Sequence, residues 1–117
     1  MSHHFVQKGW GSEEWITNTS KYCGKLLKIT AGKRTSWHYH KLKDEVMYVH
    51  TGKVKIIHGR KEDINHISNL DVTLFQGESF HIPVGLIHQI IAIEDTELFE
   101  FSTEHFDSDS YRIIKGD

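Results

Sequence analysis

Hydrophobic and polar residues alternate along most of this chain in short runs that are separated by turn-forming residues. The clearest run is Cys23 to Thr30, and similar runs cover 45–50, 54–58, 72–75, 79–82, 88–93 and 97–102. Alternation with a period of two is typical of a half-buried strand, and no stretch shows a ten-residue helical period. Gln76-Gly77 and Asp95-Thr96 are typical turns between such runs. Several short strands at regular spacing predict an all-β sandwich or barrel.

The two ends and one internal segment carry weaker patterns. Residues 1–21 hold several aromatic side chains interrupted by glycines, which predict an N-terminal strand or arm packed on the barrel. Residues 103–117 are polar and predict an extended tail or a short helix. The segment 61–69 mixes charged residues with isolated isoleucines and is interpreted as a longer hairpin tip. A chain of 117 residues can bury one core, so we expect a single domain over 1–117.

Composition and charge exclude some partners. The formal net charge is −2, so the chain has no basic footprint for nucleic acid. No apolar run approaches the roughly 20 residues of a membrane span, and the N-terminus lacks a signal-peptide core. The single cysteine, Cys23, cannot form an internal disulfide and is interpreted as a small core residue rather than a nucleophile. We therefore expect a cytoplasmic protein that binds neither nucleic acid nor membrane.

The stretch from Gly32 to Gly52 carries candidate metal chemistry. Residues i and i+2 of a strand share a face, so His38 and His40 would project together, in one row with Ser36 and Arg34. After the short connection 41–44, Glu45 opens the next strand-like run. If the two runs pair as an antiparallel hairpin, a carboxylate is brought beside two imidazoles.

A second segment, Gly77 to His88, strengthens this interpretation. A histidine pair on an exposed strand face is often only polar decoration, so the pair and Glu45 alone would be weak support for a metal site. The second segment contains Pro83, the only proline of the chain, followed by Gly85. Proline fixes φ and glycine allows positive φ, which predicts a tight turn at 83–85. His88 would then begin the next strand at a fixed position, where it could supply a further ligand.

The spacing of these residues resembles the two motifs of the cupin superfamily. Gly32-x5-His38-x-His40-x4-Glu45-x6-Gly52 is similar to the first motif, and Gly77-x5-Pro83-x-Gly85-x2-His88 to the second. The second motif usually ends in an asparagine, where this chain has Ala92, which removes a polar group from the interior but no metal ligand. The resemblance covers about residues 22–102. It implies a small jelly-roll β-barrel (a double-stranded β-helix) with one divalent transition metal (Zn, Fe, Mn or Ni) bound by His38, His40, Glu45 and His88.

Three imidazoles and one carboxylate would leave coordination positions open, which favours a functional over a structural site. Because histidine must be deprotonated to bind, occupancy should fall as the pH drops through roughly 6. The segment Trp10-Gly11-Ser12-Glu13, the second motif and the tail 107–112 resemble the cupin domain of type II phosphomannose isomerases. That resemblance implies aldose–ketose isomerisation of a sugar or sugar phosphate. Glu100 and His81 are candidate bases, and Arg34, Lys41 and Lys43 are candidate contacts for a substrate phosphate.

Two other functions stay open at this point. A non-haem metal dioxygenase would use the same open positions for oxygen and a small organic substrate. A non-catalytic module would use the cavity to bind a small acid or sugar. A barrel this small leaves Phe5, Trp10, Trp15, Phe99 and Phe106 little core to enter. Pairing through an N-terminal strand would bury some of them and protect a sheet edge, so we also expect a homodimer.

Overall fold

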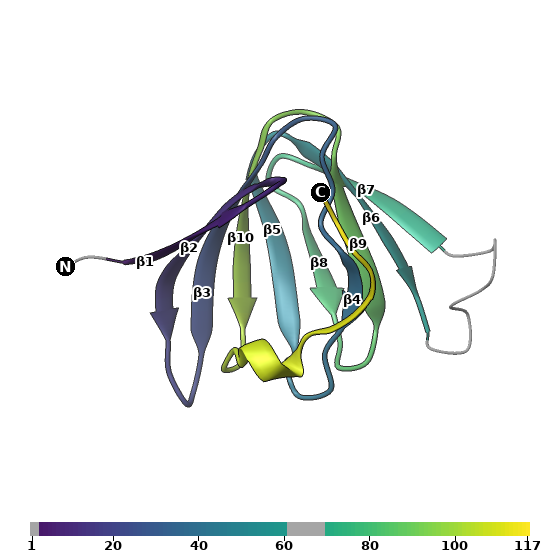
Figure 1. Cartoon of the computed structure of the whole chain (residues 1–117). Coiled ribbons are helices and arrows are strands. Elements are labelled where there is room, and N and C mark those ends of the chain that lie inside the picture. The colour runs from purple at the N-terminus through teal and green to yellow at the C-terminus, as the bar shows by residue number, and fades with distance from the viewer. Residues whose placement is uncertain (1–2, 61–69) are drawn as a thin grey trace.

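The computed structural model describes residues 3–60 and 70–117, which form two antiparallel sheets facing one another (Figure 1). The six-stranded sheet has the order β1-β2-β3-β10-β5-β8, and the five-stranded sheet has the order β11-β4-β9-β6-β7. The strands are β1 (His4–Lys8), β2 (Gly11–Asn18), β3 (Cys23–Ile29), β4 (Trp37–Tyr39), β5 (Glu45–Thr51), β6 (Lys53–Gly59), β7 (Leu70–Phe75), β8 (Ser79–Ile82), β9 (Ile87–Ala92), β10 (Thr96–Ser102) and β11 (Tyr111–Ile114). The predicted all-β jelly roll is confirmed.

The predicted alternation places one side chain in two inside the barrel. On β5 and β10 the inward row changes from apolar to polar along the strand, so the interior has an apolar end and a polar end. On β5, for example, Val49 and Met47 are followed by buried Glu45, and on β10 buried Leu98 is followed by buried Glu100. Burying an apolar side chain contributes roughly 1.5–3 kcal/mol, so the apolar end stabilises a fold that also has to bury charges.

The apolar end forms one contiguous core. Its buried members are Trp10, Leu27, Ile29, Met47, Val49, Val54, Ile56, Leu74, Ile82, Leu86, Ile90, Ala92 and Leu98. Ala92 is 1% exposed and belongs to this core, at the position where the cupin motif usually has asparagine. The expected loss of a polar group from the interior is therefore observed, and an apolar cluster surrounds the alanine.

The predicted hairpin of 38–40 with 45–50 is wrong. β4 pairs with β9 and β11 in one sheet, whereas β5 pairs with β10 and β8 in the other. The connection 41–44 crosses between the sheets, so the histidines and Glu45 face each other across the interior. Local spacing could not show this, because a four-residue connection fits both a hairpin and a crossing between sheets.

The N-terminal residues form two strands instead of a single arm. β1 and β2 make a hairpin that extends the six-stranded sheet beyond β3. Trp10, at the turn of this hairpin, enters the core, whereas Phe5 on the edge strand is exposed. The prediction of a hairpin tip at 61–69 lies outside the described residues.

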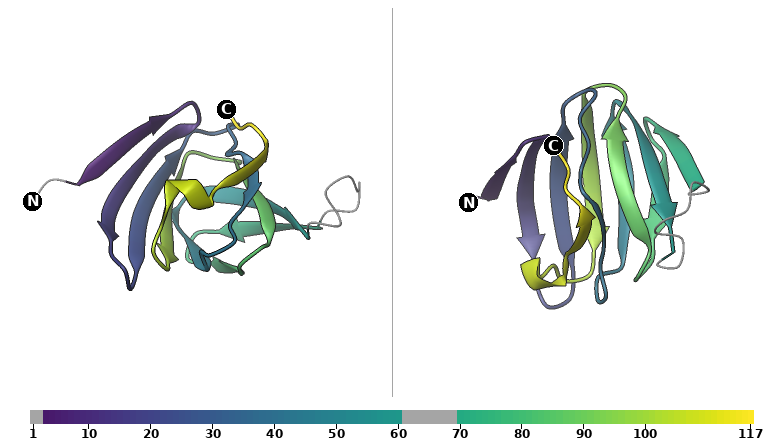
Figure 2. Two further views of the ribbon diagram at one scale, coloured as in Figure 1. Left: turned by 60° about the horizontal axis from the view of Figure 1, so that its bottom comes forward. Right: turned by 45° about the vertical axis from the view of Figure 1, so that its right-hand side comes forward.

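The C-terminal residues run from the end of β10 to the outer edge of β4 (Figure 2). A short 3-10 helix, η2 (Asp107–Asp109), is followed by β11, so both forms expected for this tail are present. Among the described residues, no helix is long and apolar enough to cross a membrane.

Candidate metal centre

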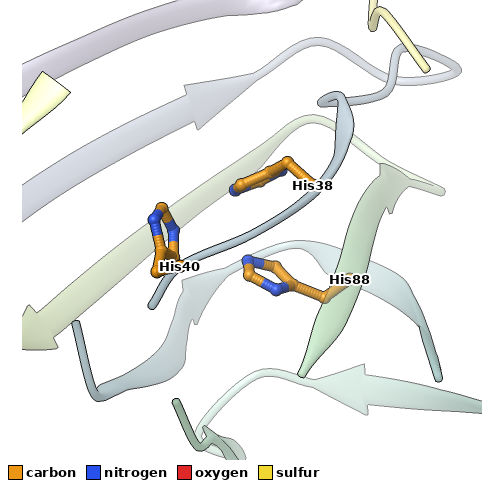
Figure 3. A group of neighbouring side chains, drawn as sticks. All are labelled: His38, His40 and His88. Atoms are coloured by element: carbon orange, nitrogen blue, oxygen red, sulfur yellow. The ribbon is translucent and has the colours of Figure 1, made fainter. Parts of the chain in front are cut away.

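Three imidazoles meet at the polar end of the interior (Figure 3). His38 and His40 lie on or directly after β4, and His88 lies on β9 opposite His38 in the antiparallel register. One ring nitrogen of each histidine lies within 4.8 Å of those of the other two. Ring centroids are 4.4 Å apart for His38 and His88, and 5.0 Å apart for His38 and His40. The sheet pairing therefore brings together ligands that are fifty residues apart in sequence.

Backbone carbonyls orient all three rings in the same way. Nδ1 of His38 donates to the Ser36 carbonyl at 2.8 Å, and Nδ1 of His88 donates to the Leu86 carbonyl at 3.0 Å. Nδ1 of His40 donates to the Asp109 carbonyl at 2.9 Å. Because a carbonyl can only accept, each Nδ1 carries the hydrogen and each Nε2 keeps its lone pair. Orientation of the remote nitrogen by a backbone acceptor is usual for metal-binding histidine.

Glu45 faces the imidazoles from the opposite sheet. Its Oε2 lies 3.2 Å from His40 Nε2, and its Oε1 lies 3.8 Å from His88 Nε2. Both Glu45 oxygens and His88 Nε2 are buried without a hydrogen-bonding partner among the described residues, so the 3.2 Å contact does not satisfy the carboxylate. Unsatisfied buried polar atoms are costly, and three at one point indicate a missing ligand. Imidazole nitrogens with one carboxylate suit a divalent transition metal.

The protonation states agree with this donor set. Burial lowers the pKa of His38 and His88, and the neighbouring imidazoles lower that of His38 further. Burial alone would raise the pKa of Glu45, but the positive charge of Lys43 helps to hold it well below its usual range. Neutral imidazoles and an ionised carboxylate are the forms that bind a cation.

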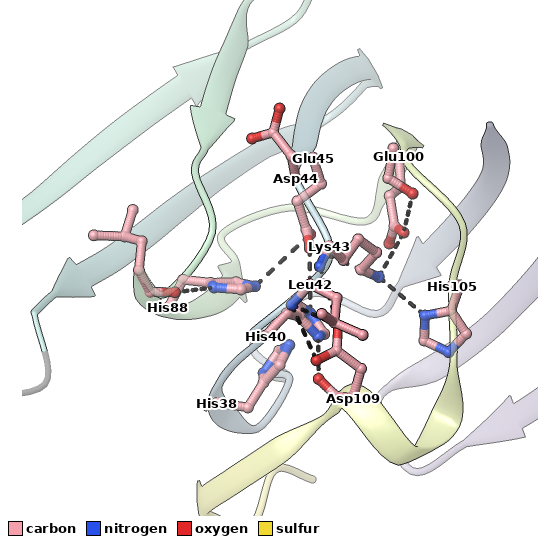
Figure 4. A network of polar contacts seen from close by, with 12 residues as sticks. His38, His40, Leu42, Lys43, Asp44, Glu45, His88, Glu100, His105 and Asp109 are labelled. Atoms are coloured by element: carbon pink, nitrogen blue, oxygen red, sulfur yellow. Dashed lines mark hydrogen bonds and ion pairs between the residues drawn. The ribbon is translucent and has the colours of Figure 1, made fainter. Parts of the chain in front are cut away.

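Asp109 connects η2 to the loop that carries the site (Figure 4). Its carboxylate accepts hydrogen bonds from the backbone N–H groups of Lys41, Leu42 and Lys43 at 2.9–3.2 Å. Its own carbonyl accepts the Nδ1 hydrogen of His40. One buried residue of the C-terminal segment therefore fixes both the crossing loop and a histidine ring.

A network of polar side chains connects Glu45 to the side of the cavity away from the three histidines. The buried Lys43 ammonium lies 3.7 Å from Glu45 Oε2 and donates to Glu100 Oε2 at 2.8 Å. The Lys43 ammonium also donates to Nδ1 of His105 at 3.1 Å. Nε2 of His105 in turn donates to the Asp107 carboxylate at 2.9 Å. Burial opposes the charge on Lys43, but Glu100 and Glu45 raise its pKa above the ordinary value. Burial and the positive charges of Lys43 and Lys25 lower the pKa of His105.

Both groups line one cavity of about 520 Å³, which is within the range of small-molecule sites. Its wall includes the three histidines, Glu45, Lys43, Glu100 and His105. Trp15 and Glu13 of the N-terminal hairpin also line it, and the Lys25 ammonium of β3 lies 3.4 Å from Glu13 and 4.3 Å from the centre of the Trp15 ring.

The structure brings only some of the predicted site residues to this cavity. Lys43 and Glu100 line it. His81, Arg34 and Lys41 do not line it, and their assignment to the site stays a prediction. His81 lies on β8 with its side chain 58% exposed and pairs with Asp44. Arg34 is exposed beside Ile91, and the Lys41 ammonium packs over the ring of Tyr111.

Several cavity residues were not predicted from the sequence. They are Glu13, Trp15, Lys25, His105 and Arg112. Glu13 and Arg112 belong to the two segments, 10–13 and 107–112, that resemble the phosphomannose isomerase domain. The sequence analysis assigned neither residue a function. No spacing links these residues to the two motifs, so their place in the cavity depends on how β2, β3 and β11 pair.

Comparisons with known proteins agree with this description. The family model described as "Cupin domain" matches residues 25–102. Comparison with curated protein sequences gave no match.

Several solved structures share the fold. Capsular polysaccharide assembling protein CapF from Staphylococcus aureus matches with a TM-score of 0.80 and 22% identity, over 96% of this chain and 34% of that chain. Oxalate decarboxylase from Bacillus subtilis matches with a TM-score of 0.80 and 15% identity, over 95% of this chain and 30% of that chain. KdgF from Halomonas sp. matches with a TM-score of 0.75 and 18% identity, over 91% and 90% of the two chains.

This chain thus spans about a third of the length of CapF and oxalate decarboxylase, and almost all of KdgF. At these identities the likeness concerns the fold. The family match covers most of the chain, and it includes every residue of the three-histidine group. The chain therefore belongs to the cupin domain family.

Proposed function

We propose that this protein is a metal-dependent enzyme acting on a small sugar or sugar phosphate, with His38, His40, Glu45 and His88 as the metal ligands. One observation carries the proposal: three oriented imidazoles and a carboxylate with no other partner converge on the wall of a cavity large enough for a monosaccharide. A structural zinc site would be closed by four protein ligands and would not face a cavity of this size.

The reaction class that this site supports best is aldose–ketose isomerisation. A bound divalent metal would supply Lewis acidity at the carbonyl and hydroxyl oxygens of the ligand. Glu45 would be occupied as a ligand, so the base must be another cavity residue, and Glu100 is our candidate because it lines the same cavity. Lys43 donates a hydrogen bond to Glu100, which positions this carboxylate to take a proton from one carbon and return it to the next.

The fold comparison supports the substrate class. CapF, which shares the fold, is described as a capsular polysaccharide assembling protein. The alternative is a dioxygenase, for which the same donor set would hold iron.

Metal analysis tests the ligand set first. Protein purified without chelators or a nickel resin should contain about one divalent transition metal per chain. Replacing His88 by Ala or Glu45 by Gln should lower metal affinity by roughly 100-fold, because each removes one of four ligands. His50, which is exposed on β5, supplies the matched control His50→Ala. Occupancy should fall as the pH drops below about 6, because protonated imidazole cannot bind. A protein that binds no metal would overturn the proposal.

Proton exchange tests the reaction. Metal-loaded protein incubated with fructose 6-phosphate, mannose 6-phosphate or fructose in heavy water should place deuterium on the carbon next to the carbonyl, as followed by NMR. Glu100→Gln should reduce this exchange by at least tenfold while metal content stays the same. Iron in the purified protein together with oxygen uptake, and no exchange, would indicate the dioxygenase instead.

A further inference from the structure

The charges on the cavity wall are balanced before any metal binds. Four cationic and four anionic side chains line it: Lys8, Lys25, Lys43 and Arg112, and Glu13, Glu45, Glu100 and Asp107. The histidines of the wall are counted as neutral, which is the form in which imidazole binds a metal, and so add no charge. A divalent cation would therefore give the loaded cavity a net positive charge of about two. Such a cavity favours a ligand with negative charge.

Three of the four cations are already paired. Lys8 and Lys25 both contact Glu13, at 3.8 and 3.4 Å. Lys43 contacts Glu100 and Glu45. Within residues 3–60 and 70–117, Arg112 is the cavity cation for which no acidic side chain lies within ion-pair distance. A guanidinium that lines a cavity without a protein partner is free to bind an anionic ligand.

The strand pairing directs Arg112 toward the centre. Arg112 on β11 lies opposite His38 on β4 in the antiparallel register, and directly opposed residues project to the same face. The next residue pair, Tyr39 and Tyr111, stacks on the other face with ring centroids 5.2 Å apart. His38 and Arg112 therefore share the cavity side of this strand pair, and both line the cavity.

We infer that Arg112 is an anion-binding residue of this cavity, and that the ligand is a small polyhydroxylated anion rather than a neutral sugar. Its carboxylate or phosphate contacts the guanidinium while oxygens at its other end reach the four-residue metal centre. Arginine suits this task because its planar fork can hold two oxygens of a carboxylate or phosphate at once. The inference rests on the proposed function and narrows it, since it assigns the charge of the ligand and the residue that selects it.

Titration calorimetry on manganese-loaded protein tests the inference, with gluconate, fructose 6-phosphate and uncharged fructose as probes. The wild-type protein should bind at least one of the two anions more tightly than fructose, and raising the salt concentration should weaken that binding. The tighter anion identifies the group, carboxylate or phosphate, that the site prefers.

Variants of the C-terminal strand assign the effect to Arg112. Arg112→Ala should weaken binding of the preferred anion by about 10- to 100-fold and leave fructose unaffected. Arg112→Lys, which keeps the charge but loses the fork, should fall between these values. Lys115→Ala is the matched control, because it removes the same charge from an exposed position of the same segment that does not line the cavity.

The outcomes separate this inference from the function on which it rests. Manganese content is measured for each variant before titration, and a wild-type protein that takes up no manganese overturns the proposed function. If manganese binds but fructose binds as tightly as both anions, or no anion binds, the inference alone is overturned. The same holds if Arg112→Ala and Lys115→Ala give equal anion affinities.

Discussion

Asp109 shows how far a single buried residue outside the two cupin motifs contributes to the site. Its carboxylate accepts three backbone N–H groups of the loop 41–43, and its carbonyl accepts the Nδ1 hydrogen of His40. Hydrogen bonds to a charged acceptor are roughly twice as strong as neutral ones. We therefore expect Asp109 to be a positioning residue, which acts on the candidate metal centre through His40 and the crossing loop.

Replacing Asp109 by Ala should leave three backbone donors without their acceptor. We expect the free energy of unfolding to fall by about 2–4 kcal/mol and metal affinity to fall by about tenfold, because the orientation of His40 is loosened. Denaturant titration measures the first effect, and the absorption spectrum and affinity of the cobalt-loaded protein measure the second.

Two further variants control this experiment. Asp109→Asn, which keeps an acceptor oxygen, should restore part of both losses. Asp71→Ala removes an exposed acid whose only described ion pair is a 3.9 Å contact with Lys55, and should change neither quantity. An unchanged cobalt spectrum in Asp109→Ala would contradict a positioning role.

Side-chain chemistry of this kind is only partly readable from sequence. The motif spacing predicted the histidines that meet, because strand periodicity fixes which of them share a face. The positions of Asp109, His105 and Arg112 depend on how the strands pair and how the loops cross. None of the three has a fixed spacing from the motifs. His81 looked equivalent to Glu100 in sequence, but the pleat of β8 turns it to the outer face.

At the scale of elements, the turn Pro83-Val84-Gly85 joins the two sheets next to the metal centre. The Leu86 N–H donates to the Pro83 carbonyl at 3.1 Å, and the Gly85 N–H donates to the His40 carbonyl at 2.8 Å. Gly85 has a φ of 86°, a left-handed conformation that costs other residues roughly 1–2 kcal/mol. The turn that was predicted from proline and glycine thus also holds the end of β4.

Gly85→Ala should destabilise the protein by about 1–2 kcal/mol, because alanine is strained at this φ even though a Cβ there would meet no other atom within 4 Å. Gly24→Ala on β3 is the matched control. Gly24 has no positive φ, and the nearest atom to an added Cβ is Thr17 Cγ2 at an ordinary 3.5 Å. Midpoints of chemical denaturation compare the two variants. Equal midpoints would show that the turn conformation is not what requires glycine.

The strands themselves followed from the sequence, whereas their pairing did not. Alternation predicted the runs that became β3, β5, β6, β7, β8, β9 and β10, because a half-buried sheet needs one apolar face. The pairing of β4 was mispredicted as a hairpin with β5. Strands joined by a short connection often pair with each other. The jelly roll instead places β4 and β5 in opposite sheets, where their polar ends face each other across the interior.

At the scale of the whole molecule, two phenylalanines lie together on the outer face of the six-stranded sheet. Glu100 points into the cavity, so its neighbours Phe99 and Phe101 lie on the outside, where their rings stack with centroids 6.0 Å apart. Phe101 is 54% exposed. An apolar patch on an outer sheet face is typical of an interaction surface.

The expected homodimer stays a prediction, and we now place its interface on this face in addition to the N-terminal strand. Light scattering at micromolar concentration should give about twice the chain mass. Phe101→Asp should shift the protein to the monomer, because each copy would bury an unpaired charge in the interface. Ile93→Asp, at an exposed position on the turn between β9 and β10, should leave the dimer intact. A monomeric wild-type protein would contradict the prediction.

The sequence by itself determined the all-β class, most strands, the tight turn at 83–85 and the histidines of the centre. These features depend on spacing within a few residues, where the period of a strand and the φ of glycine and proline act directly. Only the tertiary structure decided that the carboxylate approaches the imidazoles from the other sheet, that the Asp109 carbonyl accepts from His40, and that Arg112 lines the cavity while His81 and Arg34 do not. Those features depend on which strands pair across the whole chain, and many pairings satisfy the same alternation of polar and apolar residues.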